Sequence, residues 1–175
     1  LCGLFLGLMP YAHPAGRLVP LVVGGFLLYR MFSDRAELRR YALGLGICTL
    51  VSIVIFIPLA RYFLANPESF FGHPGAVSVF NPEVSGGDVP GTVAANALAV
   101  AGMFTFHGDE ALTHNLSGRP VFDLLLAPFF FAGVGLSLAR LRHPERREAH
   151  ILLWLWVVVM LLPSVFSHAA PNFSR

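Results

Sequence analysis

Histidines and carboxylates that could bind a ligand gather in the second half of the chain. His107-Gly108-Asp109-Glu110 is followed closely by His114-Asn115. Neutral imidazoles and carboxylates together can hold a divalent metal, so His107 and Asp109 are candidate metal ligands. Their spacing matches no recognised ligand pattern, and a hydrophilic loop with solvated charges explains the same residues. We therefore predict no firm cofactor, with His107 and Asp109 as weak metal candidates, and the participation of a divalent metal stays open.

A polar turn, Asn115 to Asp123, leads directly into an apolar stretch. Asp123 lies just inside the predicted membrane boundary, where an unpaired carboxylate is costly. It therefore reaches water, caps the start of a helix, or pairs with a cation such as Arg119 or Arg17. Capping by a helix-start carboxylate and a role at a binding site both remain open.

A third polar turn runs from Tyr11 to Arg17. Arg17 can bind a phosphate through two parallel hydrogen bonds, which a planar guanidinium does better than an ammonium. The alternative for Arg17 is an anchor at the membrane interface, and for Tyr11 an anchor is the simpler interpretation. A further polar stretch, Pro163 to His168, is explained by a proline-terminated helix with a polar end.

Apolar stretches must position these turns. A hydrocarbon core about 30 Å thick requires on the order of 20 mostly apolar residues per helix. The sequence predicts spans at about 18–32, 41–60, 121–138 and 151–167, and residues 1–9 as the tail of a further helix. Because helices satisfy their own backbone hydrogen bonds in lipid, we expect an all-α, multi-pass transmembrane helical bundle. The start within an apolar run suggests that residues 1–175 are a fragment of one longer transmembrane domain.

The composition agrees with a membrane protein. Of the residues, 55% are hydrophobic and only 13% are charged, whereas an ordinary soluble domain has about 25% charged residues. The net charge of +2 is too small for the concentrated basic face of a nucleic-acid-binding protein. The two cysteines lie in apolar runs and do not indicate a disulfide scaffold.

The arginines predict the orientation, because positive charge is retained on the cytoplasmic side. Residues 30–40 and 139–150 each contain four arginines and two carboxylates, so we expect both connections inside. Segment 61–120 contains two arginines and five carboxylates, so we expect it outside. The sequence thus predicts a multi-pass plasma (inner) membrane protein with an extracytoplasmic loop at 61–120.

This loop is too long for a plain connector. Residues 92–106 are uncharged and rich in alanine, which predicts a helix. Fifteen residues at about 1.5 Å each reach only about 22 Å, so we expect an in-plane or re-entrant helix at the outer mouth of the bundle. Before it, Val77–Phe80 is expected to be extended and Pro82–Gly91 to be flexible.

Several motifs, taken in order, resemble a known family. They are Tyr11-x-x-x-Ala15-Gly16-Arg17-Leu18-x-Pro20-Leu21, Phe104-x-Phe106-x-Gly108-Asp109, His114-Asn115-Leu116-x-Gly118-Arg119-Pro120-x-Phe122-Asp123 and Leu162-Pro163-Ser164-Val165. This order resembles the bacterial multi-pass glycosyltransferases of the protein-mannosyltransferase and aminoarabinose-transferase group. The chain departs from that pattern at Ala170-Pro171-Asn172-Phe173, where the relatives are expected to have Ala-Pro-His-Phe.

The resemblance implies a GT-C architecture, in which a helical bundle with an outward-facing cavity moves a sugar from a polyprenyl-phosphate carrier to an acceptor. It implies that the catalytic base lies upstream of this fragment. It also implies that the cavity near the lipid-linked donor is lined by Arg17, Arg119, Asp123, His114 and Asn115. A cation there would stabilise the charge that grows on the departing phosphate. The expected partners are the lipid-linked donor, membrane lipids and an acceptor that stays open, with no nucleic acid.

Two other classes remain open. A secondary transporter or permease fragment would need broken helices or buried charges near the bilayer centre, and the predicted spans show neither. A non-catalytic membrane subunit would use segment 61–120 to dock a partner. An acidic pair in a first outer loop upstream would favour the transferase, whereas an inverted repeat of the helices would favour the transporter.

Overall fold

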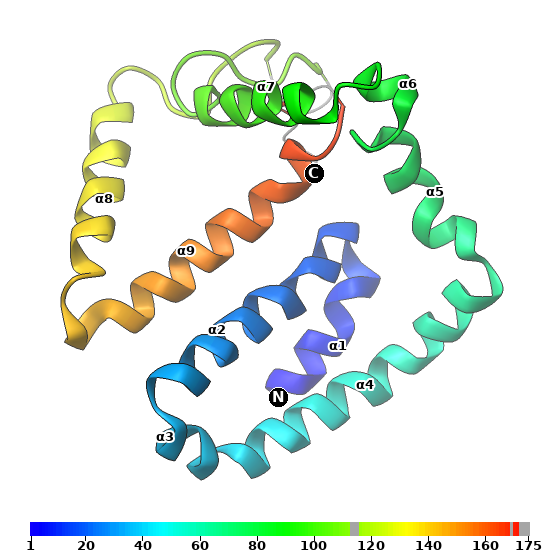
Figure 1. Cartoon of the computed structure of the whole chain (residues 1–175), viewed down its shortest axis with the longest axis vertical. Helices are drawn as coiled ribbons and strands as arrows, with labels where there is room; N and C mark the ends of the chain where they lie inside the picture. The colour runs from blue at the N-terminus through cyan, green and yellow to red at the C-terminus, as the bar shows by residue number, and fades with distance from the viewer. Residues whose placement is uncertain (113–115, 169, 172–175) are drawn as a thin grey trace. The chain divides into compact units, whose positions relative to one another are not determined.

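The computed structural model describes residues 1–112, 116–168 and 170–171, and Figure 1 shows that they form helices joined by turns. Within these residues there is no strand, only an isolated antiparallel bridge between Ser78 and Ser167. The predicted all-α class is therefore confirmed. The chain divides into two compact units, Leu1–Phe70 with Ile151–Met160, and Phe71–His150 with Leu161–Arg175.

Three helical segments of the described residues are long and apolar enough to cross a membrane: Pro14–Ser33, Ala42–Ala65 and Pro144–Val165. The segment Ala42–Ala65 is apolar on every side, and none of the residues in its most apolar window is buried within the chain. A helix that exposes Leu43, Ile47 and Leu50 in this way requires lipid or further helices around it. The coarse prediction of membrane-length apolar helices is thus confirmed.

The first unit begins with α1 (Cys2–Ala12), η1 (Pro14–Leu18), α2 (Val19–Ser33), α3 (Arg35–Arg40) and α4 (Ala42–Ala65), followed by the start of α5 (Pro67–Val77). Prolines begin several of these helices, because a missing N–H is tolerated in the first turn. Asp34 accepts a hydrogen bond from the N–H of Ala36 at 3.0 Å and so starts α3. The middle of α9 also belongs to this unit, where Leu155 approaches the backbone of Gly25.

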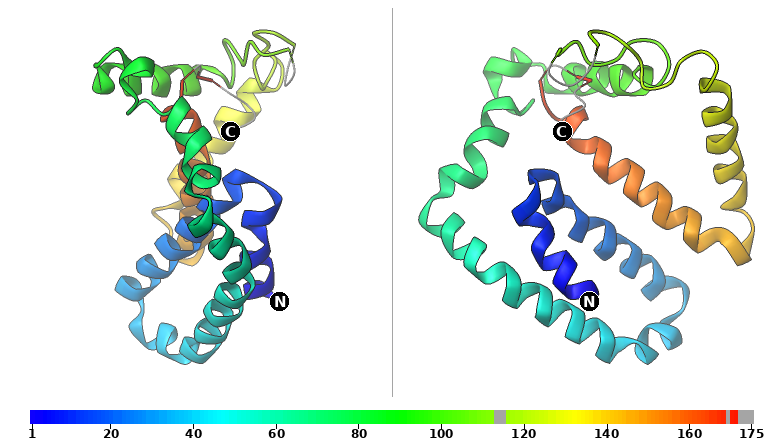
Figure 2. Two further views of the ribbon diagram at one scale, coloured as in Figure 1. Left: turned by 90° about the vertical axis from the view of Figure 1, so that its right-hand side faces the viewer. Right: turned by 180° about the vertical axis from the view of Figure 1, so that it is seen from behind.

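Helix α1 packs closely on α4, as both views in Figure 2 show. Gly3 and Gly7 are buried one turn apart on the contacting face. A Cβ atom on Gly3 would collide with the backbone carbonyl of Cys48, and one on Gly7 would lie 2.8 Å from the carbonyl oxygen of Ser52. Small residues at this spacing let two helix backbones approach closely.

The hydroxyl of Tyr11 provides a second link between α1 and α4. It donates to the carbonyl of Ile55 at 2.9 Å and accepts from the N–H of Leu59 at 3.1 Å. These groups flank Pro58, which lacks an N–H and lies inside α4. Tyr11 thus binds the α4 backbone, a role that its sequence interpretation as an anchor did not include.

The second unit contains α6 (Pro82–Ser85), α7 (Val89–Gly102), α8 (Ala127–Arg140) and both ends of α9 (Pro144–Val165). Asn96 of α7 donates to the carbonyls of Val165 and Ser167 at 2.9 and 2.8 Å. The N–H of Val79 donates to the carbonyl of Phe166 at 3.0 Å. These bonds hold α7 and the end of α5 to the C-terminal end of α9.

Several boundaries differ from the predicted ones because polar caps determine them. The expected flexible stretch 82–91 contains α6 and the start of α7, since Asn81 and Asp88 cap these helices. The expected extended run 77–80 is reduced to the single bridge at Ser78, because α5 continues to Val77. The helix expected at 92–106 spans Val89–Gly102, and its predicted in-plane or re-entrant position stays a prediction.

The largest difference concerns the span expected at 121–138. Helix α8 begins only at Ala127 and has 14 residues, which at about 1.5 Å per residue gives a length of about 21 Å. Residues 121–126 form turns before it. A continuous apolar run predicted a longer helix, but Asp123 binds the backbone ahead of Pro128 and delays the helix start.

We predict that Gly3→Ala lowers the free energy of unfolding in mixed detergent micelles by about 1–3 kcal/mol, because its Cβ must displace the α4 backbone. Gly46→Ala is the matched control, since nothing lies within 4 Å of a Cβ at Gly46. It should leave stability unchanged or raise it by up to about 1 kcal/mol. Equal effects of the two substitutions would contradict the α1–α4 contact.

Candidate functional site

A cavity of about 510 Å³ lies in the first unit, between α2 and α4. Its walls are mainly aliphatic and aromatic side chains, with the hydroxyls of Thr49 and Ser52 on one side. The lining residues are Leu6, Pro10, Arg17, Pro20, Val23, Gly24, Leu27, Leu45, Cys48, Thr49, Ser52, Ile53, Phe56 and Phe70. Among these residues, all of them described, Arg17 alone is charged.

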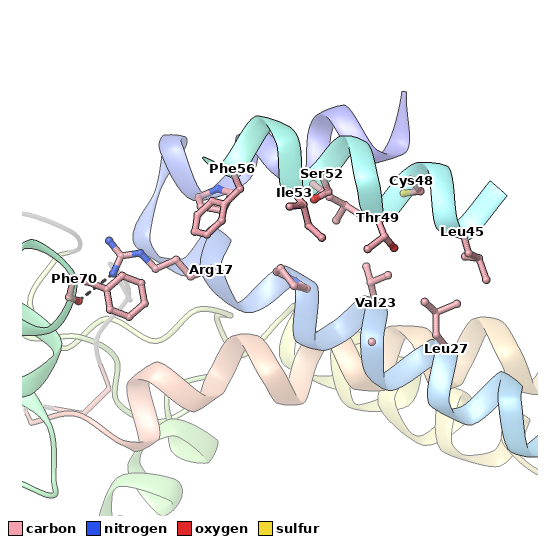
Figure 3. Close-up of a pocket in the computed structure, with 14 residues that line it drawn as sticks. Arg17, Val23, Leu27, Leu45, Cys48, Thr49, Ser52, Ile53, Phe56 and Phe70 are labelled. Atoms are coloured by element: carbon pink, nitrogen blue, oxygen red, sulfur yellow. Dashed lines mark hydrogen bonds between the residues drawn. The ribbon is translucent and has the colours of Figure 1, made fainter. Parts of the chain in front are cut away.

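The cavity is elongated along the two helices. Figure 3 shows Arg17 beside Phe70 at one end, and Leu27 and Leu45 at the other. Between the ends, Val23 of α2 faces Thr49 of α4. Pro20 and Leu27, which both line the cavity from α2, are about 10 Å apart along the helix axis, at about 1.5 Å per residue. The cavity is therefore an apolar slot with a positive charge at one end.

The guanidinium of Arg17 is held by aromatic rings and one carbonyl. Its Nη1 donates to the carbonyl oxygen of Phe70 at 3.2 Å. Its Cζ lies 4.8 Å from the ring centroid of Phe63 and 4.5 Å from that of Phe70. The two rings meet edge to face, with centroids 5.0 Å apart. Such cation–π contacts stabilise the charge without neutralising it.

Part of the guanidinium remains unsatisfied. The Nε of Arg17 is buried and, within the described part of the chain, has no hydrogen-bond partner. No carboxylate among residues 1–112, 116–168 and 170–171 pairs with Arg17. A half-buried cation without a carboxylate partner in the described chain favours an anionic ligand.

Local sequence features place Arg17 at the end of the slot. The His13 ring accepts a hydrogen bond from the N–H of Ala15 at 3.1 Å and starts η1. Gly16 packs on the backbone of Met9, with which a Cβ at this position would collide. The chain therefore turns back over the end of α1, and Arg17 lies in η1, directly before α2.

The aromatic partners of Arg17 come from the two sides of a helix break. Helix α4 ends at Ala65, and α5 begins at Pro67, with Asn66 between them. Tyr62 and Ser69 contact each other across the break through their hydroxyls at 3.3 Å. This bend brings Phe63 and Phe70 together around one guanidinium.

The second polar group of interest lies in the second unit. Segment 103–109 pairs with the turn that precedes α8. The N–H of Gly108 donates to the carbonyl of Gly118, and the N–H of Gly118 donates to that of Asp109, both at 3.0 Å. Gly118 has a φ of +71°, and a Cβ there would lie 2.9 Å from the His107 ring. The pairing therefore requires glycine at this position.

Aromatic stacking holds this turn to α8. The ring centroid of Phe122 lies 4.6 Å from that of Phe130 and 6.4 Å from that of Phe104. Phe104 and Phe130 are stacked at 5.0 Å. The structure thus brings His107, Asp109 and Arg119 into one paired segment, and it places Arg17 in the other unit.

The candidate metal ligands have other contacts. Asp109 is buried, and its Oδ1 accepts from the N–H of Ala111 at 2.8 Å. His107 is exposed and contacts Glu110 at 3.1 Å between Nε2 and Oε1. Within the described residues, no group of three His, Cys, Asp or Glu side chains could hold a metal ion. His114 and Asn115 lie outside the described residues.

Asp123 caps the turn that leads into α8. Its Oδ1 accepts from the N–H of Leu125 at 3.0 Å and from that of Leu126 at 2.9 Å. Its side chain thus closes the turn ahead of α8, while the N-cap residue of α8 itself is Leu126. Arg119 is exposed on the preceding turn, and its N–H donates to the carbonyl of Leu116 at 2.8 Å.

Sequence reasoning missed several residues of the first unit. Phe63 and Phe70 carried no signal, because an aromatic residue near a membrane boundary is common. The spacing Gly3-x-x-x-Gly7 did carry a sequence signal, since small residues four positions apart are typical of close helix packing in membranes.

No protein-family model matches the chain, and it matches no curated protein and no solved structure. The candidate site is therefore defined by its geometry: an apolar slot with Arg17 at one end. This arrangement favours a ligand with a long apolar part and an anionic head.

We predict that Asp123→Ala destabilises the turn ahead of α8 by about 1 kcal/mol, because the two side-chain hydrogen bonds to the amides of Leu125 and Leu126 are lost. Hydrogen exchange at the amides of Leu125 and Leu126 should become several-fold faster. Asp123→Asn is the control, because an amide oxygen caps almost as well as a carboxylate. If Asn and Ala accelerate exchange equally, the charge of Asp123 matters and the capping role is wrong.

Proposed function

We propose that this chain is part of an integral membrane glycosyltransferase that moves a sugar from a polyprenyl-phosphate carrier to an acceptor on the extracytoplasmic face. One observation carries the proposal: the Arg17 guanidinium, without a carboxylate partner in the described chain, lies at one end of an apolar slot. The slot suits the isoprenoid chain of such a carrier, and the guanidinium suits its phosphate.

The proposed sugar transfer is favoured by a cation close to the carrier phosphate. The bond between the anomeric carbon of the sugar and the phosphate oxygen breaks, and a bond to the acceptor oxygen forms. The carrier changes from a phosphodiester to a phosphomonoester and gains negative charge. Arg17 would stabilise this charge, most effectively where water is excluded. The proton of the acceptor passes to a general base, which we expect upstream of this chain.

The arginine distribution supports the proposed orientation. Helix α2 has Arg17 before its start and Arg30 near its end, and Arg30 opens the arginine-rich segment 30–40. If that segment is cytoplasmic, Arg17 lies at the opposite, extracytoplasmic end. The proposal therefore places the carrier phosphate at the extracytoplasmic surface of the membrane, where segment 61–120 is also expected.

The turn containing Arg119 is the second part of the proposal. Arg119, with His114 and Asn115, is a candidate donor-binding residue on the strength of the family resemblance alone. Asp123 would contribute by holding this turn through its backbone contacts. The precise pairing of Gly118 with Gly108 and Asp109 supports a fixed position for Arg119.

We predict that Arg17→Gln in the full-length protein lowers sugar transfer from a polyprenyl-phosphate donor about tenfold to a hundredfold. This range corresponds to the loss of one charge-assisted hydrogen bond, about 1.5–3 kcal/mol. Transfer is measured in membranes with a radiolabelled donor and normalised to the amount of inserted protein.

Arg61→Gln is the matched control, because Arg61 is exposed, lies in α4 and does not line the cavity. It should keep transfer within about twofold of the wild type, since exposed charges contribute little. Full activity of Arg17→Gln would remove Arg17 from the site. Carrier binding without any transfer by the wild type would instead indicate a non-catalytic lipid-binding subunit.

A further inference from the structure

A second concave site lies at the turn between α8 and α9, in the second unit. It has a volume of about 540 Å³ and is lined by Arg140, His143, Pro144, Glu145 and Arg146. Its lining is mostly basic, in contrast to the apolar slot at Arg17. The proposed sugar transfer does not use it.

Backbone hydrogen bonds fix the shape of this turn. The N–H groups of Leu141, Arg142 and His143 each donate to the carbonyl three residues earlier, at 3.1–3.2 Å. The Nε of Arg147 donates to the carbonyl of Leu141 at 2.9 Å and so closes the turn from the α9 side. The basic side chains are therefore attached to a backbone that is already ordered.

Arginines outnumber carboxylates in this turn. Residues 140–147 contain four arginines and one carboxylate, Glu145. Within the described part of the chain, Arg140 and Arg146 form no ion pair. Arg146 is exposed and Arg140 is half-buried, so both can reach an external anion.

The distance from this turn to the apolar part of α9 indicates which anion lies close to it. Helix α9 is long and apolar enough to cross a membrane, and its uninterrupted apolar part begins at Ile151. Arg146 precedes Ile151 by five residues, about 7.5 Å along a helix. This distance places Arg146 in the headgroup layer next to the hydrocarbon core.

We propose that the α8–α9 pocket binds the phosphate of an anionic phospholipid, through Arg140 and Arg146. A guanidinium group can donate two parallel hydrogen bonds to the oxygens of one phosphate. Basic pockets between membrane helices are suited to lipid headgroups. The lipid tails would lie along the apolar surface of α9, beyond Ile151. The site fixes the end of the helix pair in the leaflet that this turn faces.

Native mass spectrometry of the full-length protein tests the proposal, with phosphatidylglycerol and phosphatidylcholine as probes. We expect wild-type protein to retain phosphatidylglycerol preferentially. Arg140→Gln/Arg146→Gln should weaken phosphatidylglycerol binding at least tenfold without changing phosphatidylcholine binding. Arg140→Lys/Arg146→Lys keeps both charges and should retain at least part of the preference, which separates lost binding from lost folding.

Arg35→Gln/Arg39→Gln is the matched control, because it removes the same charge from exposed positions of α3. It should leave the lipid preference unchanged. An equal loss in both double variants would show a general charge effect and overturn the proposal, as would no loss in either. Displacement of phosphatidylglycerol by an equal concentration of glycerol 3-phosphate would assign the pocket to a soluble phosphate and also overturn it.

Discussion

Removing the guanidinium of Arg17 from water costs free energy, and two ring faces and one carbonyl offset only part of it. The first unit is arranged around this requirement. Phe63 and Phe70 reach the cation because the chain bends at Asn66, and Arg17 reaches them because η1 folds back on the end of α1. The charge of Arg17, which has no carboxylate partner in the described chain, then favours an anionic head at this end of the slot.

Long uncharged runs predicted the helical class of this chain well, because the hydrocarbon thickness demands such runs. The uncharged run 41–60 corresponds to α4, whose continuation to Ala65 includes Arg61. Counting charges failed at α8, where a turn held by side-chain hydrogen bonds precedes the helix. Nothing in the hydropathy of residues 121–138 shows that Asp123 turns back on the amides of Leu125 and Leu126.

The candidate site was predictable in part. By residue type, the sequence marked Arg17 as a candidate phosphate ligand, with an interfacial anchor as the alternative. It did not show the aromatic partners of Arg17, because these depend on the bend between α4 and α5 and on helix rotation. The burial of Asp109 was equally inaccessible, since it follows from pairing between Gly108 and Gly118, ten residues apart. Spacing alone gave His107 and Asp109 as weak metal candidates, and in the structure their side chains bind neighbouring groups.

Photolabelling with a diazirine-bearing polyprenyl phosphate tests the central claim most directly. The slot predicts cross-links, mapped by mass spectrometry, at Val23, Thr49 and Ile53, which line it. Unlabelled polyprenyl phosphate should compete and the corresponding alcohol should not, because Arg17 requires the charge. Labelling confined to Leu43 and Leu50, which are exposed outside the slot, or equal competition by the alcohol, would contradict the account.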